Sequence, residues 1–279
     1  MIWRGEKNET LYLECNMGAA GDMLMGALLE LIPDREKFLK KLNQAGLPHV
    51  KVSANPAVKC GITGTHVSVH VDGAEEESEE VSLQGSGLES QEVHEHHHGH
   101  THAHGHHHHA GMKDITEQID RLQTDEAVKE DVKNIYRIIA QAESQVHGRD
   151  ITEIHFHEVG TADALADITG CVMLIHELKP EQVLVSPVTT GFGQVRCAHG
   201  VLPVPAPATA RILMGVPCNA GRMEGELCTP TGAAILTYFA SAYGRMREMK
   251  MEKIGYGMGK KDFPAANCVR AVLGEAPAV

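Results

Sequence analysis

LYLECNMGAAGDMLMGALLELI, residues 11 to 32, has the clearest structural pattern in the chain. Leu11 to Cys15 alternate between apolar and polar side chains, which is typical of a short strand. Gly18 and Gly21 interrupt that pattern, and the apolar run from Met23 to Ile32 predicts a helix. This order of strand, tight glycine turn and helix indicates an α/β protein.

The rest of the chain continues this alternation on both sides of an abrupt change in composition. An acidic run and a histidine-rich run between about Asp72 and Gly111 contain nothing that can pack into a core. We therefore predict an α/β fold of mixed α+β type, with a layered mixed sheet, helices and a long disordered His-rich loop. Residues 1–72 form one α/β segment, 73–112 form the loop, and 113–279 form a second α/β segment that packs with the first.

Periodicity and turn residues place the individual elements. Helices are expected at 33–45, 114–122, 125–147, 161–178, 208–214 and 229–243. Strands are expected within 50–71 and at 152–157, 182–186, 249–255 and 268–273. Asp114 and either Thr124 or Asp125 are expected helix N-caps, and Thr229 is expected to cap a helix that begins at Pro230.

Charge and cysteine usage exclude several classes of protein. A formal net charge of -12 opposes binding to nucleic acid or to an anionic membrane surface, because phosphates would be repelled. Seven widely separated cysteines without a C-x-x-C pair indicate neither a disulfide framework nor a cysteine zinc site. The chain has no secretory signal pattern and no apolar run long enough to span a membrane, so a cytoplasmic protein is expected.

The histidine tract is the strongest chemical signal. Eleven of the 19 histidines lie within 16 residues: His94, His96, His97, His98, His100, His102, His104, His106, His107, His108 and His109. Neutral imidazole binds nickel, copper and zinc well, so the tract predicts capture of a late divalent metal, although spacing does not choose among these metals. The alternative is a solvated or proton-buffering linker.

A second candidate metal site lies in the sequence Ile154-His-Phe-His-Glu158. Strand alternation would place His155 and His157 on one face, which is half of a metal site. Asp163 and Asp167 follow at a helical spacing of four, so their carboxylates are expected on one helix face nearby. The alternative is that both histidines are structural and that Asp163 only complements the helix dipole.

Two glycine turns are candidate phosphate sites. Gly18 and Gly21 precede one helix, and Thr229, Thr231 and Gly232 begin another, so backbone N–H groups at both helix starts could hold a nucleotide phosphate. Each could equally be an ordinary turn and cap.

Two carboxylates flank the first of these turns. Glu14 and Asp22 could bind a cation or accept a proton, and together with Asp163 they are the candidate catalytic residues.

Several motifs together resemble the LarC family of nickel insertion proteins. They are C-N-M-G-A-A-G-D-M from Cys15, the histidine tract, H-F-H-E-V-G from His155, C-A-H-G from Cys197, L-P-V-P-A-P from Leu202, G-E-L-C-T-P-T-G from Gly225 and G-Y-G from Gly255. Glu14 stands where the family usually has Asp, and members of the family continue beyond the position of Val279 into a C-terminal domain associated with CTP binding.

This resemblance implies an enzyme, a nickel-inserting cyclometallase or chelatase of the lyase class. It would insert Ni2+ into pyridinium-3,5-bisthiocarboxylic acid mononucleotide and so form the nickel-pincer cofactor that activates lactate racemase. CTP, Mn2+ or Mg2+, the C-terminal LarC domain and the lactate racemase apoprotein are the further cofactors and partners implied. The alternative function is nickel storage or delivery without catalysis.

We predict that deletion of residues 93–110 removes most of the nickel-binding capacity and leaves the fold intact, because this segment holds the eleven clustered histidines and no core residue. Equilibrium dialysis against Ni2+ measures the capacity, and circular dichroism of the deleted protein is the control. Equal nickel uptake by the deleted and intact chains would contradict the prediction.

Overall fold

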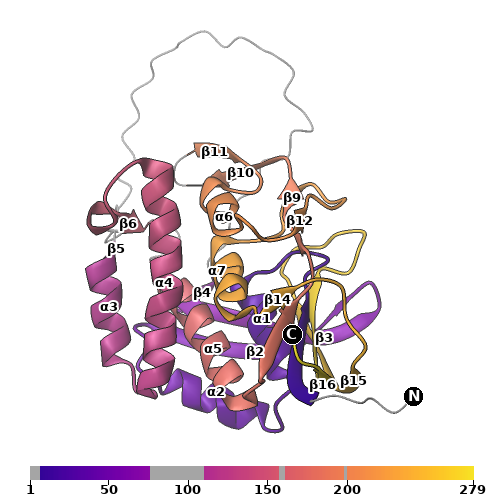
Figure 1. Cartoon of the computed structure of the whole chain (residues 1–279). Coiled ribbons are helices and arrows are strands. Elements are labelled where there is room, and N and C mark those ends of the chain that lie inside the picture. Colours follow the sequence, from indigo (N-terminus) through magenta and orange to yellow (C-terminus); the bar gives the residue numbers. More distant parts are fainter. Residues whose placement is uncertain (1–6, 76–109, 157–160, 198–199) are drawn as a thin grey trace.

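The computed structural model describes residues 7–75, 110–156, 161–197 and 200–279. A large mixed sheet and a layer of helices packed against it dominate these residues (Figure 1). The histidine tract, from His94 to His109, lies outside the described residues. The fold class predicted from the sequence, a mixed sheet layered with helices, is confirmed.

The helices are α1 (Gly21–Leu29), α2 (Arg35–Asn43), α3 (Met112–Arg121), α4 (Glu126–His147), α5 (Ala162–Leu178), α6 (Pro207–Ile212) and α7 (Pro230–Phe239). The strands that build the large sheet are β1 (Lys7–Glu14), β2 (Val50–Lys59), β3 (Ile62–Val71), β4 (Ala74–Glu75), β7 (Gln182–Val185), β14 (Ala242–Tyr243), β15 (Lys250–Met258) and β16 (Cys268–Pro277). Shorter strands are β5 (Ala110–Gly111), β6 (His155–Phe156), β8 (Val188–Thr189), β9 (Gly191–Phe192), β10 (Gln194–Cys197), β11 (Gly200–Pro203), β12 (Cys218–Asn219) and β13 (Gly225–Glu226).

The large sheet has the order β14-β7-β1-β16-β15-β3-β2, with β4 beside β3. Strands β14, β7 and β1 run parallel, whereas β16 is antiparallel to both β1 and β15. Strands from 7–75 and from 182–277 thus share one sheet. The division into three segments stays a prediction.

Strands β2 and β3 form a hairpin around Cys60 and Gly61. Both residues have positive φ, 50° and 80°, as a two-residue hairpin turn requires. The predicted pair of strands within 50–71 is therefore confirmed.

Helix α1 packs unusually close to the sheet. A Cβ atom added to Gly257 of β15 would lie 1.7 Å from the carbonyl oxygen of Met23, and one added to Gly255 would lie 2.2 Å from that of Ala27. Any larger side chain at these positions would push the helix away. The first turn of α1 is consequently held in a fixed place against β15.

Three local predictions are wrong. The predicted strand at 152–157 begins instead with a 3-10 turn, Ile151–Glu153, and only the two residues of β6 are extended. The turn forms because the Asp150 carboxylate accepts hydrogen bonds from the backbone N–H and the hydroxyl of Thr152. Gly111, not Asp114, is the N-cap of α3, and the Asp114 carboxylate accepts from the Gly111 N–H.

The third concerns the C-terminal end of α7. The helix ends at Phe239 and not near residue 243, because Ser241 donates its N–H to Val183 and the chain joins the sheet as β14.

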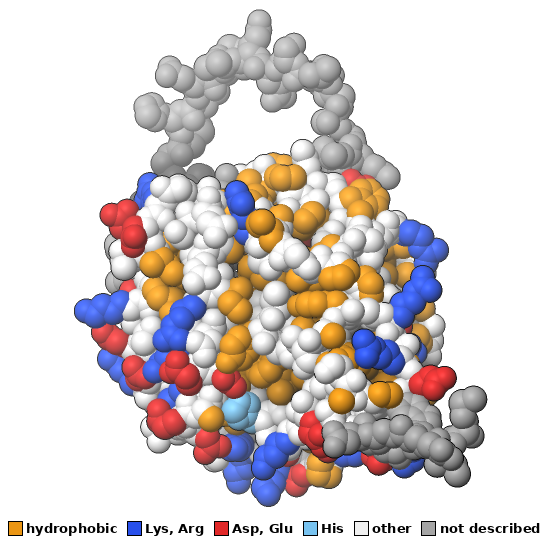
Figure 2. All heavy atoms as spheres, in the orientation of Figure 1, with side chains coloured by type: hydrophobic (Ala, Val, Ile, Leu, Met, Phe, Trp, Pro, Cys, Tyr) orange, Lys and Arg blue, Asp and Glu red, His pale blue; other side chains and the backbone are white. Residues whose placement is uncertain are grey.

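Hydrophobic side chains gather over the middle of the face shown in Figure 2, above α6, α7 and their neighbouring strands, and charged side chains surround them. Met214, at the end of α6, is 67% exposed. Among the described residues, no helix is both long and apolar enough to cross a bilayer.

We predict that Gly257→Ala lowers the free energy of unfolding by roughly 3 kcal/mol, the upper end of the usual cost of overpacking, because the new methyl group meets the backbone of α1. The matched control is Gly111→Ala, where the nearest atom would be 3.7 Å away and the expected loss is below about 1 kcal/mol. Urea unfolding of both variants gives the two values. Equal losses would show that the close packing of α1 adds nothing to stability.

Candidate functional site

The carboxyl ends of β1 and β7 lie side by side and are joined by side-chain and backbone hydrogen bonds. The backbone N–H of Cys15 donates to the Ser186 hydroxyl at 2.8 Å, and the N–H of Thr189 donates to the Cys15 carbonyl at 3.2 Å. Ligands of α/β proteins gather beyond the carboxyl ends of parallel strands. The glycine turn that leads from β1 to α1 therefore begins where a binding site is expected.

The structure brings the two predicted phosphate turns together. Ala19 donates its N–H to the Leu227 carbonyl at 3.0 Å, and Thr229 donates its N–H to the Ala19 carbonyl at 3.0 Å. A Cβ on Gly18 would lie 1.9 Å from the Leu227 carbonyl oxygen, and one on Gly232 would lie 2.2 Å from that of Ala19. The glycines thus allow the two backbones to touch.

Several N–H groups of these turns already have protein acceptors. Gly18 donates to the Cys15 carbonyl at 3.1 Å, and Gly232 donates to the Thr229 hydroxyl at 3.2 Å, which is the predicted helix cap. Thr231 is buried. A phosphate held by these N–H groups stays a prediction, and the contacts favour a structural role for Gly18 and Gly232.

Three aspartates meet between the starts of α1 and α5. The backbone N–H of Asp22 donates a hydrogen bond to the Asp167 carboxyl group. The negative charges of Asp163 and Asp22 both disfavour ionisation of Asp167. A Cβ on Gly21 would lie 2.3 Å from an Asp167 carboxylate oxygen, so only glycine leaves room for this side chain. Asp22 and Asp163, both predicted site residues, are therefore brought together through Asp167.

Burial raises the pKa of Asp167 well above its usual range, and the charges of Asp163 and Asp22 raise it further. One oxygen of this carboxyl group has no hydrogen-bond partner within the described part of the chain, and the same holds for the buried hydroxyl of Tyr136. The pKa of Tyr136 is also raised by burial and then by Asp167 and Asp163. Burial therefore favours the neutral form of Asp167, next to Asp22 and Asp163, which are only partly buried.

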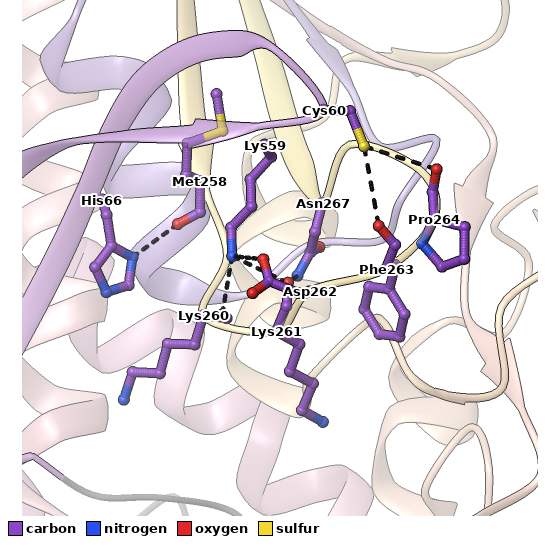
Figure 3. A network of polar contacts seen from close by, with 10 residues as sticks. All are labelled: Lys59, Cys60, His66, Met258, Lys260, Lys261, Asp262, Phe263, Pro264 and Asn267. Carbon is purple, nitrogen blue, oxygen red and sulfur yellow. Dashed lines mark hydrogen bonds and ion pairs between the residues drawn. The ribbon is translucent and has the colours of Figure 1, made fainter.

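Lys260 is the cation that acts on this cluster, because its ammonium group opposes the rise in the pKa of Asp167. It lies in the loop between β15 and β16, whose shape is set by Lys59 (Figure 3). The Lys59 ammonium group donates to the carbonyl of Lys260 at 3.0 Å and to the Asp262 carboxylate at 2.6 Å. Asn267 donates to the Lys261 carbonyl at 2.9 Å from the other side.

Glu14 belongs to a different set of contacts. Its carboxylate forms an ion pair with Arg270 of β16 and accepts a hydrogen bond from the Asn16 side chain at 3.0 Å. The charge that the sequence suggested for catalysis is thus neutralised by Arg270 in this structure.

The predicted pair of strand histidines is only partly visible. His155 lies on β6, which pairs with β5, and His157 lies outside the described residues. The described residues contain no group of three or more His, Cys, Asp or Glu side chains placed to hold a metal ion. The paired histidine ligands, His155 and His157, therefore stay a prediction.

The cysteines near the turn are buried thiols. Burial raises the pKa of Cys15 to about 12, and it raises those of Cys171 and Cys228 well above the usual range. Because the thiolate is the form that binds metals, these neutral groups are poor nickel ligands. None of the seven cysteines, all of which lie in described parts of the chain, forms a disulfide bond.

Tyr136 and Lys260 belong to the site but are not among the residues predicted from the sequence. Tyr136 follows the apolar period of α4, so nothing in the sequence distinguishes it from a core residue. Lys260 stands in G-Y-G-M-G-K-K, which lacks the spacing of a P-loop, and its effect on Asp167 of α5 depends on how distant segments pack.

Comparisons with known proteins identify the family of the chain. Residues 11–279 match the model of the family described as nickel insertion protein. The pyridinium-3,5-bisthiocarboxylic acid mononucleotide nickel insertion proteins of Desulfitobacterium hafniense and Clostridium acetobutylicum are 39% and 41% identical over 264 and 269 residues. These alignments each cover 95% of this chain but only 58% and 64% of the two relatives. No solved structure matches the chain significantly. Because the family model matches this chain from residue 11 to residue 279, the chain belongs to the nickel insertion protein family.

Proposed function

We propose that this chain takes part in inserting nickel into pyridinium-3,5-bisthiocarboxylic acid mononucleotide. The observation that carries the proposal is the 34% to 41% identity to nickel insertion proteins over about 95% of the chain, since several of these relatives are named for this reaction. The chain spans less than two thirds of the length of these relatives: its alignments cover 61% and 58% of two of them.

The aspartate cluster supplies the chemistry that such an insertion needs. Ni2+ is the metal substrate, and carboxylates of Asp22 and Asp163 attract it electrostatically. Forming a carbon-nickel bond on the pyridinium ring breaks a carbon-hydrogen bond, and the released proton requires an acceptor. A carboxylate of this cluster would accept it, because mutual repulsion within the cluster favours protonation.

The resemblance to the LarC family extends the proposal. It includes dependence on CTP and on Mn2+ or Mg2+, a C-terminal LarC domain, delivery to the lactate racemase apoprotein and action in the cytoplasm. The described residues contain no group of three or more His, Cys, Asp or Glu side chains that could hold Mn2+ or Mg2+.

Nickel storage or delivery is the second candidate function, and the histidine tract favours it. A tract of eleven histidines concentrates metal without fixing its position. Insertion requires nickel in a fixed register with the substrate. The two functions are therefore separable by changing the ordered part of the chain and the tract independently.

We predict that Asp163→Asn lowers the rate of nickel insertion at least about tenfold, because it removes one charge and one proton acceptor from the cluster without changing its volume. Mass spectrometry of the mononucleotide after incubation with Ni2+ and CTP measures the nickel product. Asp125→Asn is the control, since that side chain is exposed at the start of α4. Equal rates for the two variants would remove Asp163 from the reaction.

We predict that changing His155 and His157 together to Ala abolishes insertion and spares the nickel capacity of the tract, because forming a carbon-nickel bond needs nickel held in register with the substrate, whereas metal capture does not. Activation of apo-racemase and equilibrium dialysis with Ni2+ give the two readouts, after circular dichroism confirms the fold. Normal activation by the folded double variant would make these histidines structural.

A further inference from the structure

A hollow of about 510 Å³ opens next to the glycine turn that follows β1. Its lining includes Asn16, Thr189, Asn219, Gly221 and Arg222. This volume lies within the range of about 300–1,000 Å³ that is usual for small-molecule sites. The turn residues that line it come from the end of β1, and Thr189 comes from β8, just beyond the end of β7.

The location of the hollow follows from the topology of the sheet. Strands β1 and β7 are parallel neighbours, and both point their carboxyl ends toward this place. In open α/β sheets, ligands bind in the crevice outside these ends. The hollow is therefore where the fold itself predicts a bound molecule.

The far wall of the hollow is held against β8. Strand β12 pairs in parallel with β8, and the N–H of Thr190 donates to the Asn219 carbonyl at 2.9 Å. Gly221 has a positive φ of 73°, and a Cβ there would lie 2.4 Å from a Thr189 methyl carbon. The residues that follow Asn219, including Arg222, are thus anchored next to the strand ends.

The charge of the hollow favours an anion. Arg222 is the only side chain with a formal charge among the described residues that line it. The side-chain amides of Asn16 and Asn219 each carry two N–H groups, of which one on Asn16 donates to Glu14, and the Thr189 hydroxyl donates to the Asn219 side-chain oxygen at 3.3 Å. Among the carboxylates close to this lining in sequence, Glu14 accepts a hydrogen bond from Asn16 and pairs with Arg270, whereas Glu224 and Glu226 stand next to Met223 and Leu227. Arginine binds phosphate through two parallel N–H groups.

We propose that this hollow binds the phosphate of a nucleotide, with Arg222 as its cation and the Asn16 and Asn219 side chains beside it. The proposal rests on the proposed nickel insertion and names the phosphate site of that reaction. Met17 lines the hollow, and Asp22 follows five residues later. Because five residues of extended chain span at most roughly 18 Å, the backbones of Met17 and Asp22 lie within that distance of each other. One nucleotide would then have its phosphate near Arg222 and its ring toward the carboxylates.

Isothermal titration of the intact chain tests this site with three probes: the pyridinium-3,5-bisthiocarboxylic acid mononucleotide, its dephosphorylated nucleoside and CTP. Arg222→Ala is expected to weaken binding of the phosphate-bearing ligand at least tenfold and to leave the nucleoside unchanged, whereas Arg222→Lys retains part of the affinity. Arg247→Ala is the matched control, because Arg247 is exposed and does not line the hollow.

The three probes separate the two sources of phosphate. A loss confined to the mononucleotide assigns the hollow to the nickel acceptor, and a loss confined to CTP assigns it to the second nucleotide; both support a phosphate site. Normal binding of both nucleotides by Arg222→Ala overturns the site and leaves nickel insertion standing. If the intact chain binds none of the three probes, the phosphate site and the proposed function are both overturned.

Discussion

Backbone contact around the start of α1 is the constraint on which the rest of the structure depends. Gly257 lets β15 touch the first turn of the helix, and Gly18 and Gly232 let the preceding turn touch the segment before α7. Interiors are packed so tightly that one added methyl group at such a place displaces whole elements. These contacts fix three chain segments, far apart in sequence, at one end of the parallel strands.

The same packing has an electrostatic consequence. Because Gly21 has no side chain, the carboxyl group of Asp167 reaches the start of α1 and meets Asp22 there. A buried group of like charges is costly unless protons or cations neutralise it. Lys260 supplies part of this compensation.

Metal capture and metal insertion place opposite demands on a protein. Many histidines close together in a sequence offer overlapping sets of nitrogen ligands, which raises the local concentration of nickel. A bond between nickel and carbon requires the metal, the ring and a proton acceptor to be in register. In this chain the tract and the aspartate cluster belong to different segments of the sequence.

The sequence by itself determined the local elements: the strand, turn and helix from Leu11 to Ile32, the hairpin near Gly61 and the Thr229 cap all follow from periodicity and turn chemistry within a few residues. It also determined the family, because the motifs are long and ordered. The strand that sequence spacing predicted at 152–157 is wrong, because the Asp150 carboxylate accepts a hydrogen bond from the backbone N–H of Thr152 and a turn forms there. Only the tertiary structure decided that Asp22 meets Asp167 and that Glu14 pairs with Arg270, since such contacts depend on sheet order and on close packing between distant segments.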